Sequence, residues 1–260
     1  MKAFISQLQR KFNNLDVQNF EAALVWHYIQ KKQLNIQKAK TLDAFIEKHK
    51  PENAQLEEYI NENSVIDNID GIITAFEMLV NSNDKKTNGV IYTPLNIKEY
   101  IVKETIISDQ IPAVADPACG CGSFLITAAQ WMHEKYHISY LEIFKNHITG
   151  FDIDKHSIEK AELLFNLLSL EEDGVALDCK LMLNAANSIE ELAKEKYQGK
   201  FDIVIGNPPY VRSKNISDDL KPHLKNWSVV AGNVDLYIPF YEIAITALWG
   251  ISLQILFYKA

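Results

Sequence analysis

From about residue 88 onward, short apolar runs alternate with amphipathic stretches, and this alternation limits the possible folds more than any other feature. The apolar runs are Ala113–Ala115, His147–Phe151, Cys179–Leu183 and Phe201–Ile205, and the stretches between them are Cys121–Tyr136, Ile158–Leu170 and Ile189–Tyr197. Strands that alternate with helices form crossover units in a parallel sheet. We therefore predict an α/β fold, in which ligands bind beyond the carboxyl ends of the strands.

The first 87 residues predict helices. Apolar residues recur there at helical spacing, as at Phe20, Ala23 and Leu24 and again from Ile66 to Phe76. The polar stretch Asn81–Asn88 is the best candidate for a domain boundary. We therefore predict a helical N-terminal segment over residues 1–87 and a second domain over residues 88–260. A fifth strand is predicted over Ile251–Tyr258.

A glycine-rich turn follows the first predicted strand of the second domain. It runs from Asp116 through Ala118, Gly120 and Gly122 and opens the next helix. Glycines let a backbone turn sharply and approach a ligand closely, and the helix N-terminus behind them offers N–H groups and a partial positive charge. Asp116 is placed to accept from an ammonium or a hydroxyl. A plain strand-to-helix connection explains the same residues without a ligand.

Acidic and amide side chains end the next two strands. Asp152 follows the second strand, where an acidic residue commonly binds a ribose hydroxyl. Asp154 is an equally good cap for the next helix, so Asp152 is the better ligand candidate. In Asn184–Ser188, after the third strand, a side chain could bind the edge of an adenine. A helix cap supplied by Asn187 or Ser188 is as good an interpretation.

The decisive segment is Asn207-Pro208-Pro209-Tyr210, which follows a buried strand directly. Two prolines fix φ and remove two backbone donors, so the turn presents mainly acceptors. An exocyclic amino group needs acceptors, because hydrogen bonds to its two protons localise the nitrogen lone pair for attack on a methyl group. Tyr210 offers a face on which a base can stack, a contact worth roughly 1–3 kcal/mol. Its other interpretation is a packing aromatic beside the turn.

The charge balance argues against strong DNA binding by this chain alone. Its 26 basic and 34 acidic residues give a net charge of −8, whereas proteins that hold duplex DNA bring basic residues to the phosphates. Lys194–Lys225 is a local exception, with seven basic and four acidic residues, a balance of 7 − 4 = +3. This stretch is explained equally well by a solvated surface or by a surface that faces DNA phosphates.

The cysteines and apolar runs favour a cytoplasmic protein. Cys119, Cys121 and Cys179 give no even set of bridges and suit a reducing compartment, and two closely spaced thiols with one more elsewhere do not predict a metal site. We expect no signal peptide. The apolar stretch Ile243–Tyr258 is shorter than the roughly 20 residues of a membrane span and is predicted to be core.

Taken together, these motifs resemble the adenine-N6-specific DNA methyltransferases of restriction–modification systems, in the class whose cofactor motif precedes its Asn-Pro-Pro-Tyr motif. A further motif of that class precedes the glycine turn and matches Gly89–Pro94. There Thr93 can cap a helix with Pro94 at its first position. The resemblance covers about Gly89–Leu248. It implies a Rossmann-like class I sheet, S-adenosylmethionine as cofactor, double-stranded DNA as partner and no metal.

The resemblance also implies a role for each matching residue. Asn207 and Pro208 would hold the target amino group, while Pro209 and Tyr210 would contact the flipped base. Asp152 would bind the cofactor ribose, and Asn187 would lie against its adenine. The Asp235-Leu236-Tyr237 stretch loosely matches a segment that lines the cofactor pocket. The methionine part of the cofactor would be held by Thr93, Asp116, Ala118, Gly120 and Gly122.

This sequence also departs from the family pattern. The family has seven strands and a target-recognition domain, whereas only five strands are predicted here. We therefore expect a sheet that is incomplete at the C-terminus, in a fragment or a split subunit that needs a partner chain. Two alternatives stay open: a methyltransferase of protein glutamine or RNA, whose chemistry suits the same turn, and a remnant that binds cofactor or DNA without catalysis.

Overall fold

The computed structural model describes residues 1–37, 39–79, 92–177, 179–216, 218, 220–225, 227–229, 235–248 and 255–257. The chain divides into two compact units, Met1–Asn81 with Glu162–Cys179, and Ser82–Ala161 with Lys180–Ala260. The polar stretch 81–88, predicted as the domain boundary, lies outside the described residues. The sequence did not indicate that residues 162–179 pack with the N-terminal helices, because their apolar pattern also suits a crossover helix.

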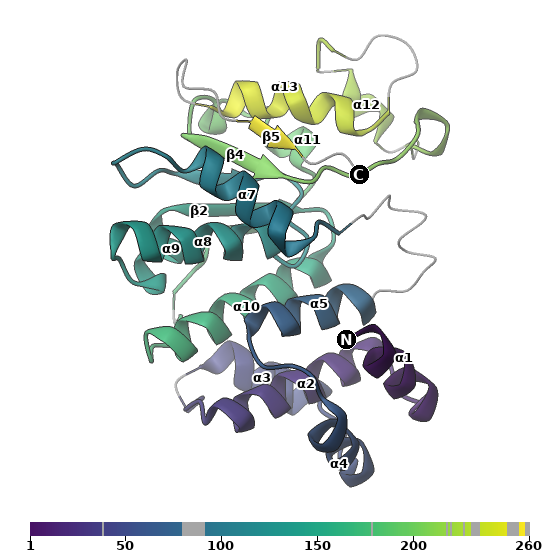
Figure 1. Ribbon diagram of the computed structural model, residues 1–260. Helices are drawn as coiled ribbons and strands as arrows, with labels where there is room; N and C mark the ends of the chain where they lie inside the picture. The colour runs from purple at the N-terminus through teal and green to yellow at the C-terminus, as the bar shows by residue number, and fades with distance from the viewer. Residues whose placement is uncertain are drawn as a thin grey trace. The chain divides into compact units, whose positions relative to one another are not determined.

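The first unit is helical, which confirms the predicted helical N-terminal segment. Its helices are α1 (Lys2–Lys11), α2 (Val17–Lys32), α3 (Lys40–His49), α4 (Ala54–Asn63) and α5 (Ile69–Leu79), joined by the later part of α10 (Lys155–Glu172) (Figure 1). Asp16 and Asn19 start α2 with a reciprocal capping box. Asn53 caps α4 by accepting from the Leu56 N–H at 3.0 Å. Local side chains therefore set where these helices begin.

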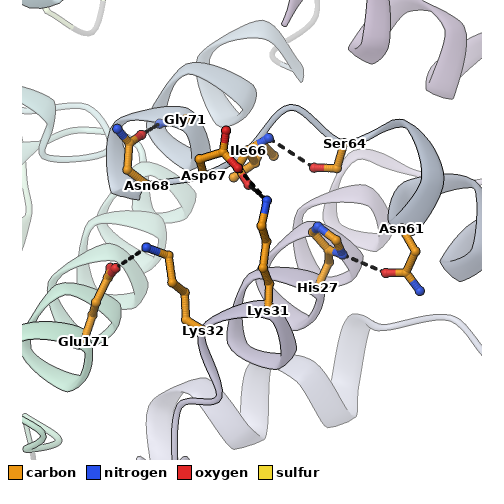
Figure 2. A network of polar contacts seen from close by, with 10 residues as sticks. All are labelled: His27, Lys31, Lys32, Asn61, Ser64, Ile66, Asp67, Asn68, Gly71 and Glu171. Carbon is orange, nitrogen blue, oxygen red and sulfur yellow. Dashed lines mark hydrogen bonds and ion pairs between the residues drawn. The ribbon is translucent and has the colours of Figure 1, made fainter.

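Polar contacts around the end of α2 tie the first unit together (Figure 2). Lys31 Nζ donates to Asp67 Oδ1 at 2.5 Å and to the Ile66 carbonyl at 3.0 Å. Lys32 pairs with Glu171 on α10 at 2.7 Å. The buried Tyr28 hydroxyl donates to the same carboxylate at 2.5 Å, and its pKa is raised by burial and by that acceptor. Lys31 and Asp67 are largely exposed, so the buried tyrosine bond stabilises the unit more than that ion pair does.

The second unit contains a parallel sheet, as the alternating pattern predicted, and its five strands lie in the order β3-β2-β1-β4-β5. The strands are β1 (Val114–Asp116), β2 (Ile148–Asp152), β3 (Leu183–Ala185), β4 (Ile203–Gly206) and β5 (Ile255–Phe257). The prediction for the third strand, Cys179–Leu183, was wrong, because pairing with β2 begins only at Leu183. Asn184 therefore lies within β3 and donates from Nδ2 to the Gly150 carbonyl at 3.2 Å.

Helices cover both faces of this sheet (Figure 1). On one face, side chains from β1, β2 and β4 share a core with α11 (Ser188–Glu191), α12 (Lys221–Leu224) and α13 (Tyr237–Ala247). On the other, α7 (Leu95–Thr105) packs on α8 (Ser123–Tyr136), which contacts β1 and β2 and is followed by α9 (Tyr140–Asn146). Two short 3₁₀ turns, Glu195–Tyr197 and Ser213–Asn215, complete the described elements.

The apolar stretch Ile243–Tyr258 contributes to this core where it is described. Ile243, Ala244, Ala247 and Leu248 are buried, and Leu248 forms a parallel bridge with Phe201. β5 pairs with β4, which confirms a fifth strand although only over Ile255–Phe257. Among the residues that the structure describes, no helix is long and apolar enough to cross a membrane.

The strand order reverses between β1 and β4. The chain proceeds outward from β1 through β2 to β3, and then returns to the other side of β1 with β4 and β5. In open parallel sheets such a switch point leaves a crevice beyond the carboxyl ends of the two central strands. Asp116 ends β1 and Gly206 ends β4, so the fold brings the glycine-rich turn and the Asn-Pro-Pro-Tyr turn to the same crevice.

Candidate functional site

The glycine-rich turn has the open, left-handed geometry that its sequence predicts. Gly120 and Gly122 have φ of 54° and 81°, a region that favours glycine. Among the described residues, and apart from its neighbours in the chain, no atom lies within 4 Å of where a Cβ of Gly120 would be, so these residues leave space beside the turn. Gly122 precedes the first residue of α8, Ser123. The turn thus leads directly into the N-terminus of a 14-residue helix, which carries a partial positive charge.

Asp116 lies in close contact with the end of β4. A Cβ added to Gly206 would lie 2.5 Å from Asp116 Oδ1, closer than atoms can approach without displacement. Asp116 Oδ1 also accepts from the Ala118 N–H at 2.9 Å. The glycine before Asn207 thus makes room for the carboxyl group that ends β1, a requirement that neither motif reveals by itself.

Burial raises the pKa of the Asp116 carboxyl to about 8, and the nearby negative charge of Asp152 acts in the same direction. The hydrogen bond from Ala118 opposes both effects. Asp116 is 1% exposed. A buried carboxyl in this state gains a large electrostatic stabilisation when a cation comes beside it, so the site favours a positively charged ligand group.

Asp152 holds the glycine-rich turn from the end of β2. Its Oδ2 accepts from the Gly120 N–H at 2.9 Å, and its Oδ1 accepts from the Asp154 N–H at 2.8 Å. Burial raises the pKa of Asp152, while these two N–H groups lower it. The side chain remains partly exposed. Asp154 caps α10 by accepting from Ser157, so Asp152 is the better placed of the two acids to meet a ligand.

Asn187 caps a helix, which was one of the two roles that its sequence position suggested. It precedes α11, and its Oδ1 accepts from the Ile189 N–H at 3.1 Å. This bond uses the oxygen of the side chain, so its Nδ2 is the atom with which it would meet an adenine.

Thr93 and Asn207 are joined by a hydrogen bond across 114 residues of sequence. Asn207 Nδ2 donates to Thr93 Oγ1 at 3.1 Å, and Thr93 is buried. The prediction that Thr93 caps a helix with Pro94 at its first position was wrong, because α7 begins at Leu95 and Pro94 is the capping residue. The helix starts one residue later than predicted, and the threonine hydroxyl accepts from Asn207 in the Asn-Pro-Pro-Tyr turn instead.

The Asn-Pro-Pro-Tyr turn continues into a row of aromatic rings. Pro208 is buried, whereas Pro209 and Tyr210 are partly exposed. The ring of Tyr210 lies 5.6 Å from that of Tyr237, measured between centroids. The segment that carries Tyr237 is held there by two bonds, Leu236 N–H to the Val211 carbonyl at 2.9 Å and Ser213 N–H to Asp235 Oδ1 at 3.1 Å. The loosely matching Asp235-Leu236-Tyr237 stretch therefore lies beside the turn.

Lys98 and Ser123 are two polar residues at this site that the sequence did not single out. Lys98 is on the first turn of α7 and is only 4% exposed. Its Nζ donates to the hydroxyl of Ser123, the first residue of α8. A lysine in an amphipathic helix is normally interpreted as a surface residue, and only the packing of α7 on α8 reveals that this one is buried.

The basic stretch Lys194–Lys225 is partly neutralised by acids. Lys194 and Lys196 both pair with Glu191, the latter at 2.7 Å. Lys221 pairs with Asp218 at 2.7 Å. Among the described residues, three of its seven cations have carboxylate partners. For those three, this favours a solvated surface over one that faces phosphates.

The cysteines of the turn are buried thiols. Cys119 and Cys121 are not joined in a disulfide. Burial raises the pKa of Cys119 well above its ordinary value, and the charges of Asp116 and Asp152 add to this effect. Over the described residues, no group of three or more His, Cys, Asp or Glu side chains could hold a metal ion.

Comparison with known proteins relates the chain to restriction–modification methyltransferases. Residues 146–252 match the family described as Eco57I restriction-modification methylase. The chain is 28% identical over 181 residues to the Type II methyltransferase M.BanIII of Aneurinibacillus aneurinilyticus, a match that covers 65% of this chain and 29% of that protein. It is 24% identical over 194 residues to M.PaeR7I of Pseudomonas aeruginosa, covering 68% of this chain and 33% of that protein. The chain thus spans about a third of the length of these relatives.

The fold is that of the class I S-adenosylmethionine-dependent methyltransferases. A structure from Listeria monocytogenes assigned to that class superposes with a TM-score of 0.51 and 14% sequence identity, over 95% of this chain and 71% of that one. The expected fold class is confirmed by this likeness and by the parallel sheet.

Proposed function

We propose that this chain, a relative of the restriction–modification DNA methyltransferases, forms the catalytic part of an enzyme that transfers a methyl group to N6 of adenine in DNA. One observation carries the proposal. The Asn-Pro-Pro-Tyr turn that ends β4 lies beside Asp116, which ends β1, and only a glycine at position 206 allows that approach. The acceptors for an amino group and the carboxyl for a cationic ligand therefore share one crevice.

The fold and the matched family imply S-adenosylmethionine as the cofactor, and the residues present fit it. The open space beside Gly120 accommodates a ligand close to the backbone. The buried Asp116 carboxyl suits a positively charged group, and the partly exposed Asp152 suits a hydroxyl. We propose that these three residues, together with Thr93, Ala118, Gly122 and Asn187, hold the cofactor. When bound, it supplies an electrophilic methyl group on a positively charged sulfur.

In the proposed mechanism, the Asn-Pro-Pro-Tyr turn prepares the amino group to attack. The side-chain oxygen of Asn207 and the carbonyl of Pro208 accept from its two protons and localise the nitrogen lone pair. Tyr210 would stack on the ring and Pro209 would contact it, which would hold the amino nitrogen at the turn. In a duplex the adenine must first be flipped out, at a cost of a few kcal/mol. With the cofactor bound, the N–C bond would form as the C–S bond breaks, the sulfur would leave as a neutral thioether, and the nitrogen would release one proton to solvent. No covalent bond to the protein would form.

The charge of this chain predicts weak binding of duplex DNA. Its net charge is −8, and three of the seven cations in Lys194–Lys225 are paired with acids. We propose that a partner chain supplies target recognition and most of the phosphate contacts. Tyr210 and its aromatic neighbours would then contact only the extruded base.

The acceptor class is tested by offering the labelled methyl group of S-adenosylmethionine to plasmid DNA, to RNA and to glutamine-containing peptides in parallel. The proposal expects label in DNA. Label in RNA or peptide with none in DNA would instead support the alternative that the same turn chemistry allows.

Thr93→Val is expected to reduce the rate of transfer by about ten-fold or more, because it removes the hydroxyl that orients the Asn207 amide. Thr93→Ser keeps the hydroxyl and is expected to stay within about three-fold of wild type. Single-turnover rates at saturating cofactor measure this effect. Equal rates in the two variants would show that the bond does not position Asn207.

Affinity for the cofactor is expected to rise with pH between pH 6 and pH 7, by up to about ten-fold. The folded protein holds a proton on Asp116 up to about pH 8, and a cationic ligand group displaces that proton. The same linkage lowers stability as pH rises from about 4 towards 8, because the unfolded chain has already released the proton. Calorimetric titrations at several pH values measure how cofactor affinity changes with pH in wild type and Asp116→Asn. Thermal melts at the same pH values measure how their stability changes. If the cofactor affinity of wild type changes with pH no more than that of Asp116→Asn, Asp116 does not have this role.

A further inference from the structure

Lys98 is a buried cation in the second unit, and it is bonded to a neutral group. It is 4% exposed, and its Nζ donates to the Ser123 hydroxyl. Among the ion pairs of the described residues, none includes Lys98. Buried charges in proteins are normally paired, because removal from water is costly. A hydroxyl offsets only part of that cost.

The location of Lys98 increases this cost further. Ser123 is the first residue of α8, so the ammonium lies at the N-terminus of a 14-residue helix. That end of a helix carries a partial positive charge, and cations are stabilising only at the opposite end. Two positive features therefore converge on one point, which is the arrangement that binds an anion.

The neighbouring carboxyl groups already have other partners. Asp116 accepts from Ala118 and Asp152 accepts from Gly120 and Asp154. The convergence at Ser123 directly follows the glycine-rich turn, beside which there is open space. A ligand held by this turn would thus have both a carboxyl group and a positive region within the residues that flank the turn.

We propose that Lys98, with the N-terminus of α8, binds the carboxylate of the amino-acid part of the cofactor. This inference rests on the proposed function, since it takes S-adenosylmethionine as the ligand. Lys98 is then a binding residue that sets the preference for a ligand with a free carboxylate. Ser123 orients its ammonium group.

Calorimetric titration of two ligands tests this role without any measurement of transfer. The ligands are S-adenosylmethionine and its decarboxylated analogue, which keeps the sulfonium and the amino group. Wild type is expected to bind the first about ten-fold or more tightly than the second. Lys98→Met keeps the length of the side chain and is expected to bind both ligands within about three-fold of each other. Lys103→Met, on an exposed position of the same helix, is expected to keep the wild-type ratio.

The possible outcomes separate the inference from the function on which it rests. If Lys98→Met keeps the wild-type ratio of affinities for the two ligands, the inference is overturned. If it loses affinity for both ligands equally and melts at a lower temperature, the lysine is structural and the inference is also overturned. If wild type binds both ligands equally well, the inference is overturned and the proposed function stands. If wild type binds neither ligand, the proposed function fails and the inference with it.

Discussion

Asn207→Ala is expected to reduce methyl transfer by about 10²–10³-fold or more while the cofactor still binds with an affinity close to that of wild type. The side chain lies at the end of β4, where its amide is oriented by Thr93. Alanine removes the acceptor for the target amino group and leaves the glycine-rich turn and Asp116 unchanged. Single-turnover rates and calorimetric titration of the cofactor measure the two effects separately.

Asn146→Ala is a suitable control, because Asn146 is exposed at the end of α9, a helix that contributes none of the proposed site residues. It is expected to behave as wild type in both measurements. Turnover at the wild-type rate in Asn207→Ala would remove this residue from its proposed role. A parallel loss of cofactor binding would show that Asn207 supports the cofactor pocket rather than the transfer step.

Gly206→Ala is expected to abolish cofactor binding and, with it, transfer. The new Cβ would lie 2.5 Å from Asp116 Oδ1 and 3.0 Å from its Cγ, so either the carboxyl group or the end of β4 must move. Both are buried, and overpacking of this kind costs roughly 1–3 kcal/mol of stability. A thermal melt and a cofactor titration of the same preparation measure the loss of stability and the loss of binding.

Gly71→Ala provides the matched control, because a Cβ on Gly71 in α5 would meet its nearest atoms at 3.4 Å. In a helix this change is neutral or stabilising by up to about 1 kcal/mol. It is expected to leave cofactor binding unchanged. If Gly206→Ala melts and binds as wild type does, the close approach of Asp116 to β4 is not needed for the site.

The sheet and its two turns could be predicted from the sequence because their determinants are local. Short apolar runs before Asp116 and Asn207 are typical of buried parallel strands, and both turns follow them directly. The third strand was misplaced by local reasoning. Leu181 and Leu183 are both apolar, but only pairing with β2 decides that the strand starts at Leu183.

Contacts between distant segments could not be predicted in the same way. That Gly206 makes room for Asp116, that Thr93 bonds Asn207 and that Lys98 is buried against Ser123 all depend on how α7 and β4 pack beside β1 and α8. A glycine before an asparagine, a threonine before a proline and a lysine in a helix each have ordinary local explanations. Their roles arise from packing that joins residues up to 114 positions apart.

The most direct test of the account identifies the methylated atom. DNA is incubated at low salt with S-adenosylmethionine and an excess of the protein, conditions that offset weak phosphate binding. It is then digested to nucleosides and analysed by mass spectrometry, with Asn207→Ala as the parallel sample. The account predicts N6-methyldeoxyadenosine with wild type and none with Asn207→Ala. Methyl groups on cytosine, or N6-methyldeoxyadenosine at equal levels in both samples, would contradict it.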